Sequence, residues 1–346
     1  MTAILQHIET LCALRGPSGR EDAVRAYLLE AIGNKAECKT DALGNLLVHK
    51  KGKSRAKKRV MLAAHMDEVG FIITGIAEEG FLKFSAVGGI DTAVLLGRAV
   101  RVGDAAIPGV IGVKPIHFLE GDQREKLPDA ADLYIDIGAE NKEAAEKLPL
   151  SPGDMGSFDS EITPFGEGFL KGRALDDRAG CAILLEMILN EQPFDLDIAF
   201  TVQEEVGLRG ASAAAFTLAP DCAIVVETTT AADLPEIEGE KRVCVLGEGA
   251  AVSFMDRSSI YNNGLYRHAL ARAAEKGIPA QPKTQVAGGN DAGVIHKSRA
   301  GVKTLTVSLP CRYLHSASCV IQQKDIQSVY DLVCQLAADF ADDTID

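Results

Sequence analysis

The amino-acid sequence predicts an α/β protein in which a mixed, largely parallel sheet flanked by helices is interrupted by a small β-rich domain. Apolar runs typical of strands covered on both faces alternate with helical patterns, which favours a largely parallel sheet. Between residues 69 and 163 the pattern changes to short alternating apolar segments, with 13 glycines in 95 positions against 33 in all 346. This density is typical of closely spaced turns between strands. We therefore expect a discontinuous α/β domain, 1–68 with 164–346, and an inserted β-rich domain, 69–163.

The first sixty residues predict a helix followed by two strands. Ser18 and Glu21 have the spacing of a capping box, so a helix should begin there. The apolar runs 45–49 and 60–64 predict strands. The basic run 50–59 between them predicts the exposed turn of a hairpin rather than a nucleic-acid site.

The later elements of the α/β domain follow from the apolar periodicity. The expected order is a helix over 181–189, strands over 198–202 and 223–226, a helix over 261–276, a strand over 302–309, and a last helix containing Ile326, Val329, Tyr330 and Val333.

The composition excludes several classes of protein. The chain is 47% hydrophobic, enough for a sizeable core, and its 36 Lys and Arg against 49 Asp and Glu argue against a nucleic-acid partner. No uncharged apolar run approaches the roughly 20 residues of a membrane helix, and the first residues lack the pattern of a signal peptide. The eight scattered cysteines form no C-x-x-C pair and suggest reduced thiols. We expect a cytoplasmic protein without a membrane partner.

Ionisable residues follow the predicted strands at the point where each strand ends. They are His65 and Asp67, Glu204 and Glu205, Glu227, and His315, together with Asp176 and Asp177 before the helix over 181–189. Ligands of open α/β sheets bind beyond the carboxyl ends of the strands. Each residue alone is typical of a turn, a cap or a surface ion pair. Gathered at one edge, the carboxylates would repel one another, and metal ions would relieve that repulsion.

The residue types favour a mixed nitrogen and oxygen metal site. Two histidines with three carboxylates suit zinc, cobalt or manganese. Asp67 could accept the second ring N–H of His65 and so fix the tautomer that coordinates. Glu204 and Glu205 are neighbours at a predicted strand end, so their side chains should diverge, and one could bind metal while the other serves as a general base.

Five segments resemble, in order, the motifs of one enzyme family. They are HMDEVGF at 65–71, LDDRAG at 175–180, TVQEEVGLRGA at 201–211, GGNDA at 288–292 and RYLHS at 312–316. On these motifs the chain resembles the M42 family of co-catalytic metallo-aminopeptidases, whose members carry the names glutamyl aminopeptidase, deblocking aminopeptidase or cellulase M. The resemblance implies an aminopeptidase-type α/β domain, an inserted PDZ-like β-barrel domain, and hydrolysis of the N-terminal peptide bond.

The resemblance also implies two metal ions, with Zn²⁺ favoured and Co²⁺ or Mn²⁺ as alternatives. His65, Asp176 and Glu227 would hold one ion, and Asp176, Glu205 and His315 would hold the other, so that Asp176 bridges them. The family more often has Asp where this chain has Glu227.

The remaining roles implied by the resemblance are catalytic and supporting. Glu204 would be the general base for a metal-bridging water that attacks the scissile carbonyl. Asp67 would orient His65, and Asp177 would support the site beside an unusual, cis peptide bond. The partners implied are peptides with a free N-terminus and other copies of the chain, in a dodecamer or a dimer built through the inserted domain.

Two other functions compete with this interpretation. An endoglucanase would use Glu204 and Glu205 as acid and nucleophile, although adjacent strand residues point apart and the chain has no tryptophan for sugar stacking. A non-catalytic peptide-binding or assembly protein would use the edge of the inserted sheet. The sequence leaves the roles of two residues undecided. For His296 we expect a structural role rather than a metal-ligand role. Arg312 could bind a substrate carboxylate or pair with an acid of the core.

Overall fold

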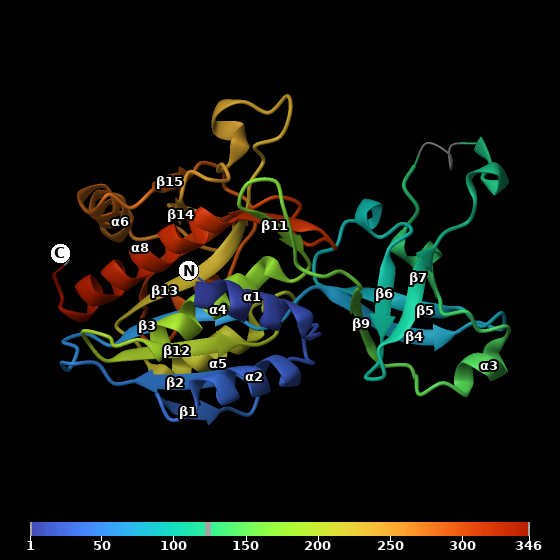
Figure 1. The fold of residues 1–346 in the computed structure, drawn as a ribbon, viewed down its shortest axis with the longest axis horizontal. Helices are drawn as coiled ribbons and strands as arrows, with labels where there is room; N and C mark the ends of the chain where they lie inside the picture. The colour runs from blue at the N-terminus through green and yellow to red at the C-terminus, as the bar shows by residue number, and fades with distance from the viewer. Residues whose placement is uncertain (1, 122–125, 345–346) are drawn as a thin grey trace.

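An eight-stranded mixed sheet and a closed six-stranded barrel organise the chain (Figure 1). The computed structural model describes residues 2–121 and 126–344. In order across the sheet, the strands are β1 (Glu37–Thr40), β2 (Leu46–Lys50), β12 (Leu196–Thr201), β3 (Val60–His65), β13 (Cys222–Thr230), β16 (Lys303–Cys311), β14 (Ala250–Ser253) and β15 (Ala280–Lys283). Strands β12, β3, β13 and β16 run parallel, so their carboxyl ends meet at one edge.

Helices cover both faces of the sheet because each strand buries its side chains alternately on the two sides. In β3, Leu62 packs into the larger core and Met61 into the core on the opposite face. The first face carries α1 (Thr2–Ala13), α2 (Asp22–Ile32), α4 (Leu175–Leu189), α6 (Asn263–Lys276) and α8 (Gln323–Ala341), and the second carries α5 (Arg209–Leu218) and α7 (Ala292–Ile295). Helix α4 is almost wholly buried between the sheet and α1, which explains its apolar sequence.

The barrel stands beside the α/β layers, to the right in Figure 1, and is built from the strands between Gly70 and Phe158. Its order is β4 (Gly70–Ile76), β5 (Leu82–Val87), β8 (Tyr134–Asp136), β7 (Ile107–Gly112), β6 (Ala99–Val102) and β9 (Met155–Phe158), with antiparallel neighbours throughout. Phe71 meets Phe84 and Phe158 edge-on inside it, with ring centroids 5.4 and 5.2 Å apart. The short helix α3 (Lys142–Glu146) lies near β4.

Short elements complete the structure. A three-stranded sheet contains β10 (Thr163–Phe165), β11 (Phe169–Gly172) and β17 (Cys319–Gln322), and 3₁₀ turns occur at η1 (Thr92–Val94), η2 (Ile116–Phe118), η4 (Ala130–Asp132) and η5 (Gly239–Arg242). The predicted fold class, a mixed α/β sheet with an inserted β-barrel, is confirmed. Among the helices of residues 2–121 and 126–344, none is long and apolar enough to cross a membrane.

Two local predictions are wrong. Strands β2 and β3 do not form a hairpin, because β12 lies between them and pairs antiparallel with β2 and parallel with β3. The capping box is also absent, since α2 begins at Asp22 after an N-cap at Glu21 that makes no side-chain capping bond. The Ser18 hydroxyl donates instead to Asp67, 2.6 Å away, and Glu21 accepts the N–H of Gly19 at 2.7 Å. Both side chains therefore make other hydrogen bonds and do not cap the helix.

Candidate metal centre

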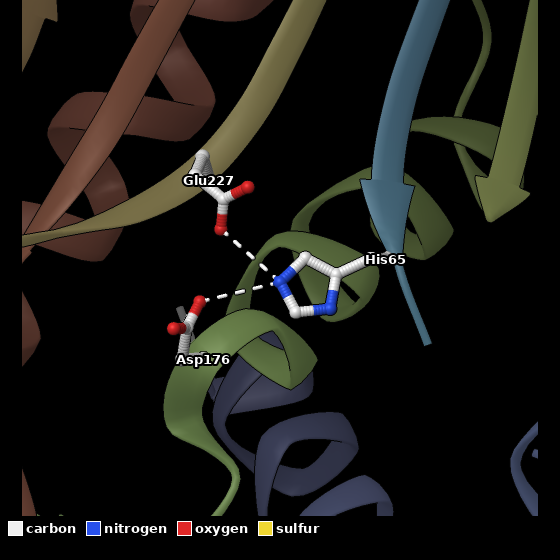
Figure 2. Close-up of side chains that lie close together, drawn as sticks. All are labelled: His65, Asp176 and Glu227. Carbon is white, nitrogen blue, oxygen red and sulfur yellow. Dashed lines mark ion pairs between the residues drawn. The ribbon is translucent and has the colours of Figure 1, made fainter. Parts of the chain in front are cut away.

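Two histidines and three carboxylates meet at the carboxyl edge of the parallel strands. His65 is the last residue of β3, Glu227 lies in β13, Asp176 stands at the start of α4, and Glu205 and His315 follow β12 and β16. In Figure 2 the side chains of His65, Asp176 and Glu227 point toward one another. Segments far apart in the chain therefore supply one cluster, because the parallel sheet brings their strand ends together.

Asp176 lies between the two histidines and turns a different oxygen toward each. Its Oδ1 is 3.4 Å from Nε2 of His65, and its Oδ2 is 3.2 Å from Nε2 of His315. Oε1 of Glu227 lies 3.3 Å from Nε2 of His65, and Oε2 of Glu205 lies 3.4 Å from Nε2 of His315. Within each group of three residues, the donor atoms all lie within 4.8 Å of one another. These are the same two groups of residues that the resemblance implies as metal ligands.

Both histidines turn the same ring nitrogen into the cluster. Nδ1 of His65 lies 3.0 Å from the backbone carbonyl of Asp67, and Nδ1 of His315 lies 2.8 Å from the carbonyl of Gly89. Because a carbonyl only accepts, each Nδ1 carries a proton, and each Nε2 is the nitrogen that faces the cluster and would bind a cation. Gly89 belongs to the segment between β5 and η1, so the inserted barrel region orients a histidine of the α/β domain.

The spacing of the donors fits a metal ion. Ligand bonds of about 2.1 Å at tetrahedral angles would place ligand atoms about 3.4 Å apart, and the four measured separations run from 3.2 to 3.4 Å. Oδ1 of Asp176 and Oε1 of Glu205 are buried and have no hydrogen-bond partner among the described residues. Buried, unpartnered carboxylate oxygens beside lone pairs of imidazole are donors that a divalent cation would satisfy.

The charge balance of the cluster also favours cations. Burial and the charge of Asp176 raise the pKa of Glu205 to about 8. Burial, opposed by His65 and reinforced by Asp176, raises the pKa of Glu227 to about 8 as well. Burial lowers the pKa of His315, but Asp176 and Glu205 outweigh it and raise that pKa to about 10. Without metal, the cluster thus binds extra protons, which divalent cations would replace.

We expected the carboxylate of Asp67 to accept the second ring N–H of His65, but the backbone carbonyl of Asp67 does so. Its Oδ1 is 3.5 Å from Nδ1 of His65, whereas its backbone carbonyl is 3.0 Å from the same nitrogen. The main-chain oxygen therefore fixes the tautomer of His65. The carboxylate of Asp67 is fully buried and accepts the hydroxyl of Ser18 and the backbone N–H groups of Glu204 and Glu205. Burial raises its pKa, but His65 and these donors outweigh burial and hold the pKa below its usual range.

Glu204 is a buried carboxylate on which the charges of His65 and Glu227 both act. Strand β12 ends at Thr201, so Glu204 and Glu205 lie in a turn beyond the strand rather than at its end. Burial raises the pKa of Glu204 well above its usual value; the charge of His65 opposes that shift, and the charge of Glu227 adds to it. The turn begins at Gln203, whose φ of 56° is left-handed and costs energy in a residue with a side chain.

Asp177 explains the glycine of the LDDRAG motif. Its side chain is fully buried, and its Oδ1 accepts the backbone N–H of Gly180 at 3.1 Å. A Cβ at Gly180 would lie 2.4 Å from both carboxylate oxygens of Asp177. The peptide bond between Asp176 and Asp177 is cis, as the resemblance implies.

Arg312 and His296, whose roles the sequence leaves undecided, both contact other groups of the protein. The guanidinium of Arg312 binds both carboxylate oxygens of Asp233 at 2.7 and 2.6 Å and lies over the ring of Phe169. Arg312 is therefore paired with an acid of the protein, and Asp233 is engaged away from the cluster. Nδ1 of His296 lies 2.6 Å from the carbonyl of Ala292, and His296 is in neither donor group.

Three further residues, Ser18, Gly89 and Asp291, contact the site residues or the strand ends beside them, although none of the three is predicted as a site residue. Oδ2 of Asp291 accepts the hydroxyl of Thr201 at 2.6 Å, while its buried Oδ1 has no partner among the described residues. Asp291 lies inside the GGNDA motif, so its position was visible, but its contact with the end of β12 was not. Ser18 matches only a capping pattern and Gly89 matches none of the motifs, so the sequence does not indicate these contacts, which depend on tertiary packing.

Comparisons with known proteins agree with this geometry. The model of the M42 glutamyl aminopeptidase family matches residues 44–332. The glutamyl aminopeptidase of Lactococcus lactis subsp. cremoris is 32% identical over 339 residues, which cover 93% of this chain and 92% of that protein.

Solved structures agree as well. The TET aminopeptidase of a marine sediment archaeon, Thaumarchaeota archaeon SCGC AB-539-E09, superimposes with a TM-score of 0.91 at 35% identity, covering 97% of this chain and 98% of that one. The TET1 peptidase of Pyrococcus horikoshii, described as assembling into a tetrahedron or a large octahedral shell, superimposes with a TM-score of 0.84 at 34% identity, covering 96% and 99%. The resemblance seen in the motifs is thereby confirmed. The chain belongs to the M42 glutamyl aminopeptidase family and is a peptidase that acts at the N-terminus of peptides.

Proposed function

We propose that the chain hydrolyses the N-terminal peptide bond with two divalent cations and with Glu204 as general base. One observation carries the proposal: Asp176 turns one oxygen to each of two histidines, and each histidine has its own further carboxylate. His65, Asp176 and Glu227 would hold one cation, and Asp176, Glu205 and His315 would hold the other. When bound, such cations acidify a water molecule and polarise the scissile carbonyl.

The residues of the chain then have separable tasks. Glu204 takes a proton from the attacking water and passes it to the departing amine. Its raised pKa suits both halves of that transfer. Asp67 holds the backbone of Glu204 and Glu205 in place, so that the base and one metal ligand keep a fixed separation. Asp177 packs against Gly180 and holds the start of α4, which presents Asp176.

The resemblance favours zinc, and the donor set is compatible with it. Each group has one imidazole nitrogen and two carboxylate oxygens, with no thiolate, and zinc, cobalt and manganese accept such a set. Glu227 has a longer side chain than the Asp that is more frequent in the family. Its Oε1 nevertheless reaches within 3.3 Å of Nε2 of His65, which supports its role as a ligand.

The barrel domain is proposed to serve assembly and substrate access. The described assembly of the TET1 peptidase supports an oligomer for this chain, and the contact between Gly89 and His315 would link the barrel to the site. We place the domain boundaries at 69 and 163 and propose a homo-oligomer, a dodecamer or a dimer, that acts on peptides with a free N-terminus.

The endoglucanase alternative has less support. Glu205 would have to act as a nucleophile, yet its Oε2 lies 3.4 Å from Nε2 of His315, in a metal-type donor group. Release of sugar from a polysaccharide, assayed beside aminoacyl p-nitroanilides, distinguishes the two activities. The non-catalytic alternative has no such observation in its favour.

The decisive experiment replaces the proposed base and leaves the ligands in place. Glu204→Gln should retain its metal content, measured by elemental analysis, and lose turnover of aminoacyl p-nitroanilides by about a thousandfold or more. Glu79→Gln, an exposed glutamate of the barrel, is the matched control and should retain both metal and activity. Near-normal turnover in Glu204→Gln would exclude Glu204 as the base.

A further inference from the structure

The two donor groups of the candidate metal centre differ in their surroundings. We call the group of His65, Asp176 and Glu227 the inner group, because all three residues are buried. The other group shares Asp176 and adds two partly exposed ligands, Glu205 and His315. We call it the barrel-side group, because the first residues after strand β5 of the barrel lie against both of its unshared ligands.

Gly89 orients His315 through its main chain. The carbonyl of Gly89 accepts from Nδ1 of His315 at 2.8 Å, so that Nε2 faces the cluster. His315 itself has a φ of 57°, in the left-handed region that costs energy for a residue with a side chain. Two residues later, Ala317 is buried in the apolar core of the barrel. The barrel therefore holds the strained loop of His315 at two points.

Gly88 leaves room for Glu205. A Cβ at Gly88 would lie 2.8 Å from Cγ1 of Val69, closer than carbon atoms approach without bonding, and 3.3 Å from Cβ of Glu205. The φ of Gly88 is also 86°, which glycine adopts readily and other residues do not. Any side chain at this position would therefore push the barrel segment and Glu205 apart.

Little free space separates the barrel from these ligands. Val69 and Phe158 of the barrel core line a space of about 10 Å³ together with Glu205 and His315. A water molecule needs at least that volume. Because protein interiors are closely packed, a displacement of the barrel at this joint would be felt by both ligands.

The inner group is supported from within the α/β domain. Nδ1 of His65 faces the carbonyl of Asp67, and Oε1 of Glu227 accepts the backbone N–H of Thr228 at 3.0 Å. Both supporting residues are the close sequence neighbours of the ligands that they hold. The inner group should therefore keep its geometry when the barrel segment moves.

We propose that Gly88 and Gly89 are positioning residues for the barrel-side group, so that the barrel completes one of the two metal sites. This role rests on the two-cation function proposed above. Replacing a residue that orients a metal ligand typically weakens metal binding 10- to 100-fold. Disturbing the barrel segment should therefore weaken one cation and leave the other in place.

The test measures the zinc bound by the intact protein after dialysis against known concentrations of free Zn²⁺. We expect about two equivalents in the wild type. Gly88→Ala should bind one equivalent as the wild type does and the second 10- to 100-fold more weakly. Excess Zn²⁺ should restore the second equivalent in Gly88→Ala, because every ligand is still present. His315→Ala lacks a ligand and should not recover in this way.

Two further glycines provide matched controls. Gly97 lies in the barrel region with a φ of 71°, but a Cβ there would meet nothing within 4 Å. Gly97→Ala therefore has similar backbone strain and should bind both cations normally. Gly89→Ala keeps the carbonyl, and its Cβ would lie 3.5 Å from Nδ1 of His315, an ordinary contact. It should also bind both cations.

Two more variants locate the effect. Ala317→Gly removes a methyl group from the barrel core and should weaken the second equivalent about two- to fivefold. It provides a second measurement if Gly88→Ala does not fold, which circular dichroism detects. Adding His315→Ala to Gly88→Ala should release no further metal, whereas adding His65→Ala should, because effects on one group are not additive.

Three outcomes would overturn this role. Wild-type affinity for both equivalents in folded Gly88→Ala and in Ala317→Gly would show that the barrel does not position the ligands. Equal weakening in Gly97→Ala would attribute the effect to backbone strain. Further loss of metal when His315→Ala is added to Gly88→Ala would place the effect on the inner group. A wild type that binds a single cation would instead contradict the two-cation function on which this role depends.

Discussion

The carboxylate of Asp67 binds the backbone of Glu204 and of the residue after it, with Oδ1 3.0 Å from the N–H of Glu204 and Oδ2 3.1 Å from the N–H of Glu205. One fully buried side chain thus fixes both the proposed base and a proposed metal ligand. Asp67 is two residues from His65, so the same short segment also sets a ligand of the other metal group. The two halves of the centre are coupled through Asp67.

Replacing Asp67 should lower turnover more than metal binding. In Asp67→Asn, the new amide can accept from only one of the two N–H groups and turns a donor toward the other. We expect kcat to fall about 10- to 100-fold, as for other supporting residues of metal sites. Ser18→Ala, which removes a single hydrogen bond to the same carboxylate, is the milder control. Equal kcat values in Asp67→Asn and the wild type would contradict this role.

The shared position of Asp176 makes a distinct prediction about metal content. Asp176→Asn weakens a donor of both groups, whereas His315→Ala removes a donor of one group only. We expect elemental analysis to find less than one equivalent of metal in Asp176→Asn and about one in His315→Ala, against about two in the wild type. Equal metal content in the two variants would show that Asp176 does not bridge.

Gly180 should be intolerant of any side chain. A Cβ there would lie 2.4 Å from both oxygens of Asp177, which is itself fully buried. We expect Gly180→Ala to lower the free energy of unfolding by about 1–3 kcal/mol through overpacking, measured by urea denaturation. Gly75→Ala is the control, because a Cβ at Gly75 would meet nothing within 4 Å. A Gly180→Ala variant as stable as the control would contradict the packing argument.

The sequence predicts the parts of the fold and site that depend on strand ends. Parallel strands bring their carboxyl ends together whatever their order, so His65, Glu205, Glu227 and His315 could be grouped without knowing which strands are neighbours. Strand order itself was not predictable. The insertion of β12 between β2 and β3 depends on long-range pairing that no local pattern encodes.

Supporting contacts were harder to predict than ligands. Gly89 and His315 are separated by 226 residues, and their contact depends on how the barrel packs against the α/β domain. Ser18 matched a capping pattern, yet its hydroxyl is used by Asp67 because a buried carboxylate gains more from a donor than an exposed helix end does. Tertiary context overrode the local signal.

The titration of Asp325, a buried carboxylate far in sequence from the residues of the metal centre, should be visible in the pH dependence of the free energy of unfolding. Its oxygens accept the backbone N–H groups of Gly247 at 2.6 Å and Gly249 at 2.9 Å. Burial raises its pKa to about 6, and those two hydrogen bonds only partly oppose the shift. Because the pKa is higher in the folded state than in the unfolded state, the folded protein binds more protons between about pH 4 and 6. Ionised Asp325 therefore costs stability above pH 6, and that cost disappears as the pH falls to 4.

We expect the difference in unfolding free energy between the wild type and Asp325→Asn to shift in favour of the wild type as the pH falls from 7 to 4. The shift should be on the order of 2 kcal/mol. Urea denaturation of both proteins at intervals of pH measures it, and comparison with Asn removes the contributions of every other titrating group. Asp331→Asn serves as the control, because Asp331 lies on the same helix and its carboxylate accepts from the side chain of Gln327 rather than from the 247–249 turn. A difference that stays constant between pH 4 and 7 would show that Asp325 titrates at an ordinary pKa, and a shift in favour of the Asn variant as the pH falls would show that its pKa is lowered; either result contradicts the prediction.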